Sequence, residues 1–219
     1  MKDPGSIEVR RAVEQGRIPA VWLWAGPEDY LKDELFRLLA AKAVDEAMAS
    51  LNVCRFRAGE DGIDRILTGV RMLTPLLPGA EITLEANPGT VEAARFAGFR
   101  AAGVTRISLG IQSFNPRHLQ ALGRIHDDSE ARRAAELAAT HFDTYNLDLM
   151  YALPGQTLAE ALADIDTALM FQPPHLSAYH LTLEPNTPFG HAAPPNLPDD
   201  DLAANMQLAI ESRLHEAGM

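Results

Sequence analysis

From residue 81 onward, four polar side chains follow short apolar runs, each at or near the expected end of a strand. They are Glu85 in 81-EITLE-85, Gln112 in 105-TRISLGIQ-112, Asp148 in 144-TYNLDLM-150 and Glu184 in 176-LSAYHLTLE-184. The carboxyl ends of parallel strands share one edge of a sheet, where loops and helix N-termini converge and ligands bind. For each residue alone, the alternative is that it satisfies nearby backbone groups or caps the next helix. Four residues in equivalent positions favour a ligand site.

The segments between these runs have the composition and length of helices. They are 91-VEAARFAGFRAAG-103, 129-SEARRAAELAATH-141 and 158-LAEALADIDTALMF-171. Thr157 and Glu160 have the spacing of a capping box, and Gly103 is suited to end a helix. Strands that alternate with such helices predict βαβ units and a parallel sheet. We therefore predict an α/β fold with a partial parallel (β/α) barrel, in which four strands leave an exposed edge.

The first part of the chain is predicted to be a small α/β segment. Two strands and two helices are expected to alternate, over residues 20–26, 28–44, 51–57 and 62–73. Residues 1–73 hold 11 Lys/Arg against 12 Asp/Glu, whereas residues 74–219 hold 8 against 18. This change in charge balance predicts a domain boundary at about residue 73.

Composition excludes several classes of protein. With 219 residues and 47% hydrophobic residues, the chain can bury one good-sized core or two small ones. No apolar run approaches the roughly 20 residues that span a bilayer, and the N-terminus lacks the apolar stretch of a signal peptide. A single cysteine, Cys54, excludes an intramolecular disulfide framework and fits a cytoplasmic location. The net charge of −11 disfavours non-specific nucleic-acid binding, which needs clustered cations.

Six motifs run through residues 74–219 in a specific order and spacing. They are 81-EITLEANPGTVE-92, 103-GVTRISLGIQSF-114, 122-LGRIH-126, 146-NLDLMYALPGQT-157, 174-PHLSAYHLTLEPNTPF-189 and 197-LPDDD-201. In these motifs the chain resembles the radical-SAM proteins of the oxygen-independent coproporphyrinogen oxidase group, specifically the HemW-type haem chaperones. One departure is Ala152, where the family usually has Gly. We expect the added methyl to tighten this turn without abolishing the fold.

The resemblance implies a partial (β/α)₆ barrel that binds S-adenosylmethionine across the strand ends. The cofactor-binding residues that it implies are Glu85, Gln112, Arg124 in LGRIH, and Asp148. Such acids can accept hydrogen bonds from an ammonium group or ribose hydroxyls, and an arginine can meet a carboxylate. The resemblance further implies a [4Fe–4S] cluster and haem as a ligand.

The cluster ligands of the family are missing from this chain. The family holds its [4Fe–4S] cluster with Cys-x-x-x-Cys-x-x-Cys on the first strand, and an all-cysteine site needs these thiolates. Here Cys54 stands alone in 52-NVCRFR-57 and is expected to be an ordinary buried strand residue. The family's Gly-Gly-Gly-Thr-Pro loop and its C-terminal His-Asn-x-x-Tyr motif are also absent. We therefore predict no radical chemistry, no catalytic residue and no metal ligand.

Two stretches in the first part of the chain resemble a different protein family. In 17-RIPAVWLWAGPEDYLKDELFRLL-39 and 51-LNVCRFRAGE-60, residues 16–60 resemble the N-terminal domain of the bacterial DNA polymerase III delta subunit, a clamp-loader component. This resemblance implies an alternative function, a module that binds the sliding clamp. A third hypothesis is that the chain is a fusion of two gene fragments, joined between residues 60 and 75.

Overall fold

The computed structural model describes residue 37 and residues 62–73, 76–90, 93–185 and 187–219. The chain divides into two compact units, Met1–Pro75 and Leu76–Met219. In the first unit, helix α4 (Ile63–Leu73) confirms the helix predicted over 62–73. Apart from Arg37, which is helical as predicted, several predictions lie outside the described residues. These are the elements predicted over 20–57, Cys54, and the segment that resembles a clamp-loader subunit.

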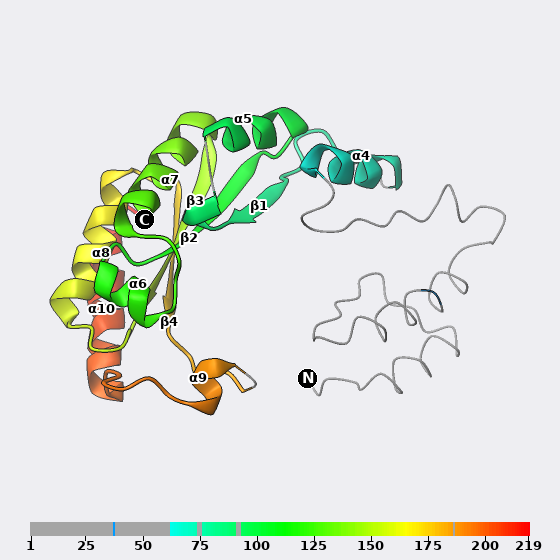
Figure 1. Ribbon diagram of the computed structural model, residues 1–219. Coiled ribbons are helices and arrows are strands. Elements are labelled where there is room, and N and C mark those ends of the chain that lie inside the picture. Colours follow the sequence, from blue (N-terminus) through cyan, green and yellow to red (C-terminus); the bar gives the residue numbers. More distant parts are fainter. Residues whose placement is uncertain (1–36, 38–61, 74–75, 91–92, 186) are drawn as a thin grey trace, which may run out of the picture. The chain divides into compact units, whose positions relative to one another are not determined.

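Four parallel strands form a single sheet in the second unit, in the order β1-β2-β3-β4 (Figure 1). The strands are β1 (Thr83–Ala86), β2 (Arg106–Gln112), β3 (Thr144–Tyr151) and β4 (His175–His180). All three pairings are parallel, and the sheet does not close on itself. The predicted α/β fold with an incomplete parallel barrel is therefore confirmed.

Helices connect the strands and follow the last one. They are the 3₁₀ helix η2 (Pro88–Thr90), α5 (Ala93–Ala102), α6 (Pro116–Ala121), α7 (Asp128–His141), α8 (Leu158–Met170), α9 (Pro188–His191) and α10 (Asp200–Glu216). The predicted capping box is present, because Thr157 and Glu160 exchange side-chain and backbone hydrogen bonds at the start of α8. Gly103 follows α5 with a φ of 101°, as expected of a residue that ends a helix.

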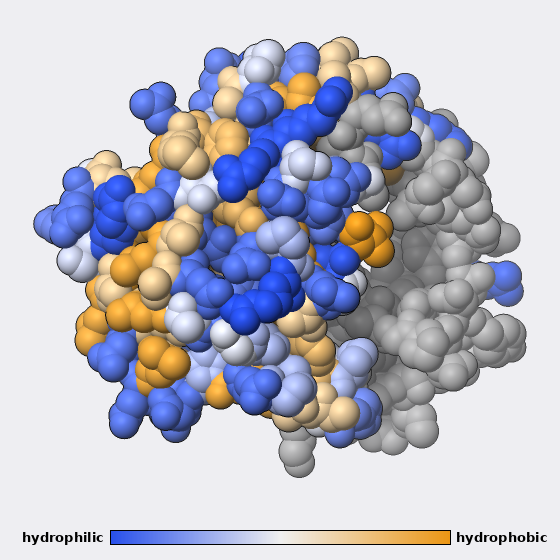
Figure 2. All heavy atoms as spheres, turned by 60° about the vertical axis from the view of Figure 1, so that its left-hand side comes forward, coloured by the Kyte–Doolittle hydropathy of each residue, from blue (hydrophilic) through white to orange (hydrophobic). Residues whose placement is uncertain are grey.

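The apolar core lies between one face of the sheet and the helices. Along β2, residues Ile107, Leu109 and Ile111 are fully buried, and Leu147 and Leu149 of β3 are their equivalents. Helix α7 contacts β2 and β3, while α8 and α10 contact β3, so these helices cover the same face. Removing each such side chain from water stabilises the fold by about 1.5–3 kcal/mol. On the outer side of the helices, hydrophilic and hydrophobic residues are interspersed (Figure 2).

Helix α10 was not predicted, although it completes the core of the second unit. It packs against α8 through a narrow apolar stripe in which Ala203, Met206 and Ile210 are buried. Three apolar positions spaced three and four residues apart fit one face of a helix, but most of the remaining residues are polar. The stripe was therefore too narrow to stand out from the sequence.

Ala152 directly follows β3 and adopts a left-handed backbone conformation, with a φ of 57°. Its side chain is buried. A residue with a Cβ atom pays a steric cost of roughly 1–2 kcal/mol in this conformation, whereas glycine does not. The departure from the family's glycine at this position therefore introduces local strain without a change of fold.

We predict that Ala152→Gly raises the free energy of unfolding by up to about 1 kcal/mol. The free energy gained by relieving the backbone strain exceeds the entropic cost of a more flexible unfolded chain. The matched control is Ala163→Gly on the exposed side of α8. This substitution should lower the free energy of unfolding by about 1 kcal/mol. Urea denaturation of the two variants and the parent measures both changes. Equal destabilisation by the two substitutions would contradict the strain at Ala152.

Candidate functional site

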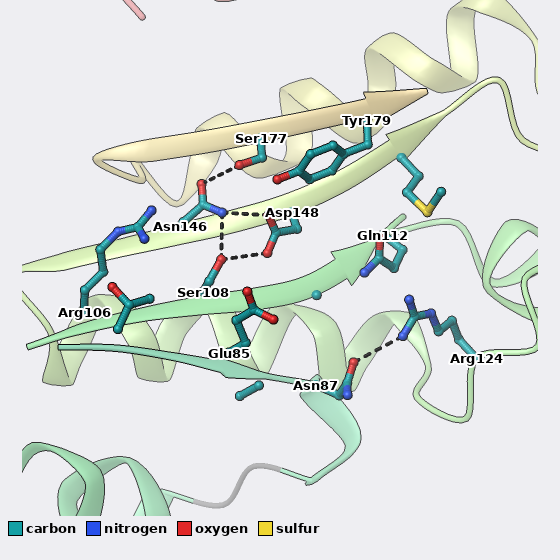
Figure 3. A pocket seen from close by; sticks show the side chains of 14 residues that line it. Glu85, Asn87, Arg106, Ser108, Gln112, Arg124, Asn146, Asp148, Ser177 and Tyr179 are labelled. Atoms are coloured by element: carbon teal, nitrogen blue, oxygen red, sulfur yellow. Dashed lines mark hydrogen bonds between the residues drawn. The ribbon is translucent and has the colours of Figure 1, made fainter. Parts of the chain in front are cut away.

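The face of the sheet opposite the helices forms the floor of a pocket of about 700 Å³ (Figure 3). This volume falls within the range of about 300–1,000 Å³ typical of small-molecule sites. Glu85, Gln112, Arg124 and Asp148 all line the pocket, so the fold brings together the four side chains that the family resemblance implies. Two carboxylates, one guanidinium and one amide thus face the same cavity.

The positions of these side chains along their strands differ in part from the prediction. Gln112 is the last residue of β2, and Glu85 is the third of four residues in β1. Asp148, however, is the fifth of eight residues in β3 and so lies in the middle of the strand. It reaches the pocket because its side chain projects from the open face, rather than because the strand ends there.

Glu184 does not belong to the pocket, and the prediction of its position was wrong. Strand β4 ends at His180, and the last backbone contact with β3 is the bond from Leu181 N–H to Tyr151 O. The chain then enters a turn in which the exposed Glu184 accepts a hydrogen bond from the Thr182 hydroxyl at 3.1 Å. Its carbonyl oxygen accepts from the Thr187 hydroxyl, so Glu184 has the local structural role that was the alternative.

Gln112 reaches the pocket through an unusual backbone conformation. Its φ is 67°, and the register between β2 and β3 shifts between Leu109 and Gln112. A Cβ atom on Gly110 would lie 2.9 Å from Gln112 Nε2 and 3.3 Å from Asn87 Oδ1. The glycine therefore leaves the space that the Gln112 amide occupies. Backbone strain of this kind in a non-glycine residue is often found at functional sites.

The turn after β1 holds the loop that carries Arg124. Arg124 Nη1 donates a hydrogen bond to Asn87 Oδ1 at 3.2 Å, and a Cβ atom on Gly89 would lie 3.2 Å from His126 Cβ. His126 is buried, and its Nε2 lies 3.1 Å from the carbonyl oxygen of Ile111. The Asn-Pro-Gly turn and the LGRIH loop are thus packed against each other, which directs Arg124 toward the pocket.

A buried carboxylate supports the segment that follows Gln112. Asp164 of α8 accepts hydrogen bonds from the Ser113 hydroxyl at 2.6 Å and from the Phe114 backbone N–H at 2.8 Å. Its exposed fraction is 4%, and this burial raises the pKa of the Asp164 carboxyl above its usual range. Asp164 therefore fixes the end of β2 from behind the sheet, without itself lining the pocket.

The sequence analysis missed the polar side chains that alternate along the strands. Arg106, Ser108, Asn146, Ser177 and Tyr179 all line the pocket. Arg106 and Ser108 lie two residues apart on β2, as do Ser177 and Tyr179 on β4, and Asn146 lies two residues before Asp148 on β3. Side chains on one face of a strand must have this spacing. The alternation is present in 106-RISLGIQ-112 and 144-TYNLDLM-150, where every second residue is polar or glycine up to Gly110 and Asp148.

No three side chains of His, Cys, Asp or Glu gather to form a metal site within the ranges that the structure describes. In the same ranges, no helix is long and apolar enough to cross a membrane. The pocket is lined by hydrogen-bonding groups and by charged groups of both signs, which suit a polar organic ligand with donors and anionic groups.

A model of the radical SAM superfamily matches residues 7–168. The chain belongs to this superfamily. The match begins before the clamp-loader-like segment and runs through it into the sheet. The parallel sheet with its helices matches the fold of this superfamily.

Among curated proteins, the chain is 58% identical over 137 residues to the heme chaperone HemW of Escherichia coli (strain K12), with 62% of this chain and 36% of that protein covered. It is 60% identical over 122 residues to HemW of Haemophilus influenzae, with 55% of this chain and 32% of that protein covered. The chain thus spans about a third of the length of these relatives.

Among solved structures, the coproporphyrinogen III oxidase HemN of Escherichia coli superposes with a TM-score of 0.64 at 25% identity, covering 71% of this chain and 37% of that one. The Elp3 protein of Methanocaldococcus infernus superposes with a TM-score of 0.54 at 15% identity, covering 95% and 50%. The likeness to HemN confirms the predicted resemblance to coproporphyrinogen oxidases, and the likeness to Elp3 shows the fold alone.

We predict that Asp164→Asn changes the pH dependence of stability. A carboxyl whose pKa is raised by folding binds its proton more tightly in the folded chain, so the parent gains stability as the pH falls through that pKa. The asparagine variant lacks this gain. The free energy of unfolding of the parent minus that of the variant should therefore increase from pH 7 to pH 4 in urea denaturation. A difference that does not vary with pH would contradict the burial of a titrating Asp164.

Proposed function

We propose that residues 74–219 form the S-adenosylmethionine-binding part of a cytoplasmic HemW-type haem chaperone, preceded by a separate segment, residues 1–73. The observation that carries the proposal is the convergence of Glu85, Gln112, Arg124 and Asp148 on one pocket. The identity to HemW proteins and the likeness to HemN support the same family of ligands.

The pocket chemistry fits S-adenosylmethionine. This ligand carries an ammonium group and ribose hydroxyls, which donate hydrogen bonds, and a carboxylate, which accepts them. We propose that Glu85 and Asp148 accept from the donors and that the Arg124 guanidinium meets the carboxylate. The amide of Gln112 can donate and accept at the strand end. Each residue thereby binds and orients the ligand through a charge or a hydrogen bond of the required type.

The chain does not fit the [4Fe–4S] cluster that the resemblance implies. An all-cysteine cluster site needs several thiolates, and the sequence has one cysteine, Cys54. We therefore propose that this chain binds S-adenosylmethionine without cleaving it reductively, and that any function in haem handling rests on binding. No specific observation in the described residues favours the sliding-clamp alternative, which stays a prediction from sequence, as does the fusion of two gene fragments.

Calorimetric titration of the full chain with S-adenosylmethionine tests the proposed site. We expect Glu85→Gln and Asp148→Asn each to weaken binding by about 10- to 100-fold, because charged hydrogen bonds worth roughly 1.5–3 kcal/mol lose their charge. Glu136→Gln on the exposed side of α7 removes the same charge outside the pocket and should leave binding unchanged. Failure of the parent to bind, or equal affinity in all variants, would refute the site.

Anaerobic reconstitution with iron and sulfide tests the absence of radical chemistry. We expect no stoichiometric cluster absorbance and no 5′-deoxyadenosine from S-adenosylmethionine under reducing conditions. A full-length HemW homologue treated in parallel provides the positive control for cluster assembly. A stable, cysteine-ligated [4Fe–4S] centre in this chain would overturn the proposal.

A further inference from the structure

A closed set of hydrogen bonds holds the Asp148 carboxylate within the pocket (Figure 3). Asn146 Nδ2 donates to Asp148 Oδ1 at 2.8 Å and to Ser108 Oγ at 2.9 Å. Ser108 Oγ donates to Asp148 Oδ2 at 2.7 Å, and Ser177 Oγ donates to Asn146 Oδ1 at 3.1 Å. Both carboxylate oxygens thus accept one bond each, from side chains on β2 and β3, and β4 supplies the outermost donor.

The hydrogen bonds of this set run in one direction, toward the carboxylate. The Asn146 amide uses both of its hydrogens, and Ser108 accepts one bond and donates another. The opposite orientation of the Asn146 amide would place its oxygen against Asp148 Oδ1, where two acceptors repel. Asn146 is 3% exposed and Ser108 is 8% exposed, so a lost partner would leave a buried polar group unsatisfied. The geometry therefore admits one arrangement.

We propose that Asn146 and Ser108 are positioning residues that set the orientation of Asp148 for ligand binding, and that Ser177 fixes the Asn146 amide. This inference rests on the proposed S-adenosylmethionine site. A carboxylate oxygen has about two acceptor directions, so each Asp148 oxygen keeps one for a donor of the ligand. Because two bonds prevent the carboxylate from rotating, the ligand meets a preorganised acceptor and binding orders fewer groups.

A purely structural role makes a different prediction. Cross-strand hydrogen bonds between Ser108, Asn146 and Ser177 could serve only to join β2, β3 and β4. In that case, substitutions would alter the stability of the sheet and leave ligand affinity and its pH dependence unchanged. The two roles are therefore separable by a binding measurement on a variant that keeps the shape of the network.

Asn146→Asp is that variant, because it conserves shape and replaces a donor with a carboxylate 2.8 Å from Asp148 Oδ1. Calorimetry of the full chain with S-adenosylmethionine should show affinity reduced about 10- to 100-fold at pH 8. At pH 5.5 part of this loss should be recovered, because the introduced carboxyl lies beside a second carboxylate, holds a proton and can then donate as the amide does. The parent should show no comparable recovery.

Two controls accompany this variant. Asn205→Asp, at an exposed position of α10, changes the net charge equally and should bind as the parent does at both pH values. Ser177→Ala should weaken S-adenosylmethionine binding several-fold. Ser177→Thr keeps the hydroxyl and should therefore bind S-adenosylmethionine as the parent does. The two Ser177 variants test the inference in case Asn146→Asp fails to fold. Ser177 lies on the edge strand β4, where a substitution should disturb folding less.

The outcomes separate this inference from the function on which it rests. If the parent binds S-adenosylmethionine and the affinity is insensitive to Asn146→Asp and to loss of the Ser177 hydroxyl, the positioning role is overturned and the proposed function stands. If the parent does not bind, both are overturned. Loss of affinity in Asn146→Asp with recovery at pH 5.5, together with rescue by Ser177→Thr, supports the positioning role.

Discussion

The parallel register of the four strands is the constraint on which the pocket depends. Ser108 pairs with Glu85 on one side and with Asn146 on the other, and Asp148 pairs with Ser177. Side chains of paired residues project from the same face, so a shift of one residue would move these polar groups into the helical layer and expose the aliphatic ones. Parallel sheets are usually apolar on both faces and covered on both. Here the polar second face forms the floor of the pocket instead of a second core.

Groups behind and beside the sheet then hold the loops in position. Asp164 fixes the chain after Gln112 through Ser113 and Phe114, and Asn87 holds Arg124. Neither arrangement follows from the register, because both involve segments beyond the strands. The strained backbone of Gln112 is tolerated because the buried acid and the space beside Gly110 determine its place.

The strand and helix order could be predicted because it depends on local periodicity and turn chemistry. The capping box of Thr157 and Glu160 and the stop at Gly103 are short-range features of this kind. The end of β4 was misplaced, since 181-LTLE-184 has the alternation of a strand but pairs with β3 only through Leu181. Which polar residues share the pocket required the register between distant strands, so Ser108 and Ser177 could not be placed beside Asn146 from the sequence.

The hydrogen-bonded set around Asp148 is difficult to explain by stability alone. Buried polar groups lose hydration on folding, and their mutual hydrogen bonds commonly do little more than offset that loss, so well-packed apolar side chains can serve a sheet equally well. We propose that they instead serve to direct the Asp148 carboxylate toward a ligand. The side chains of this set lie within Leu76–Met219, whereas the single cysteine of the sequence, Cys54, lies outside this unit. The hydrogen bonds around Asp148 therefore involve no thiolate, so the proposed orientation of a ligand does not depend on whether a cluster is present.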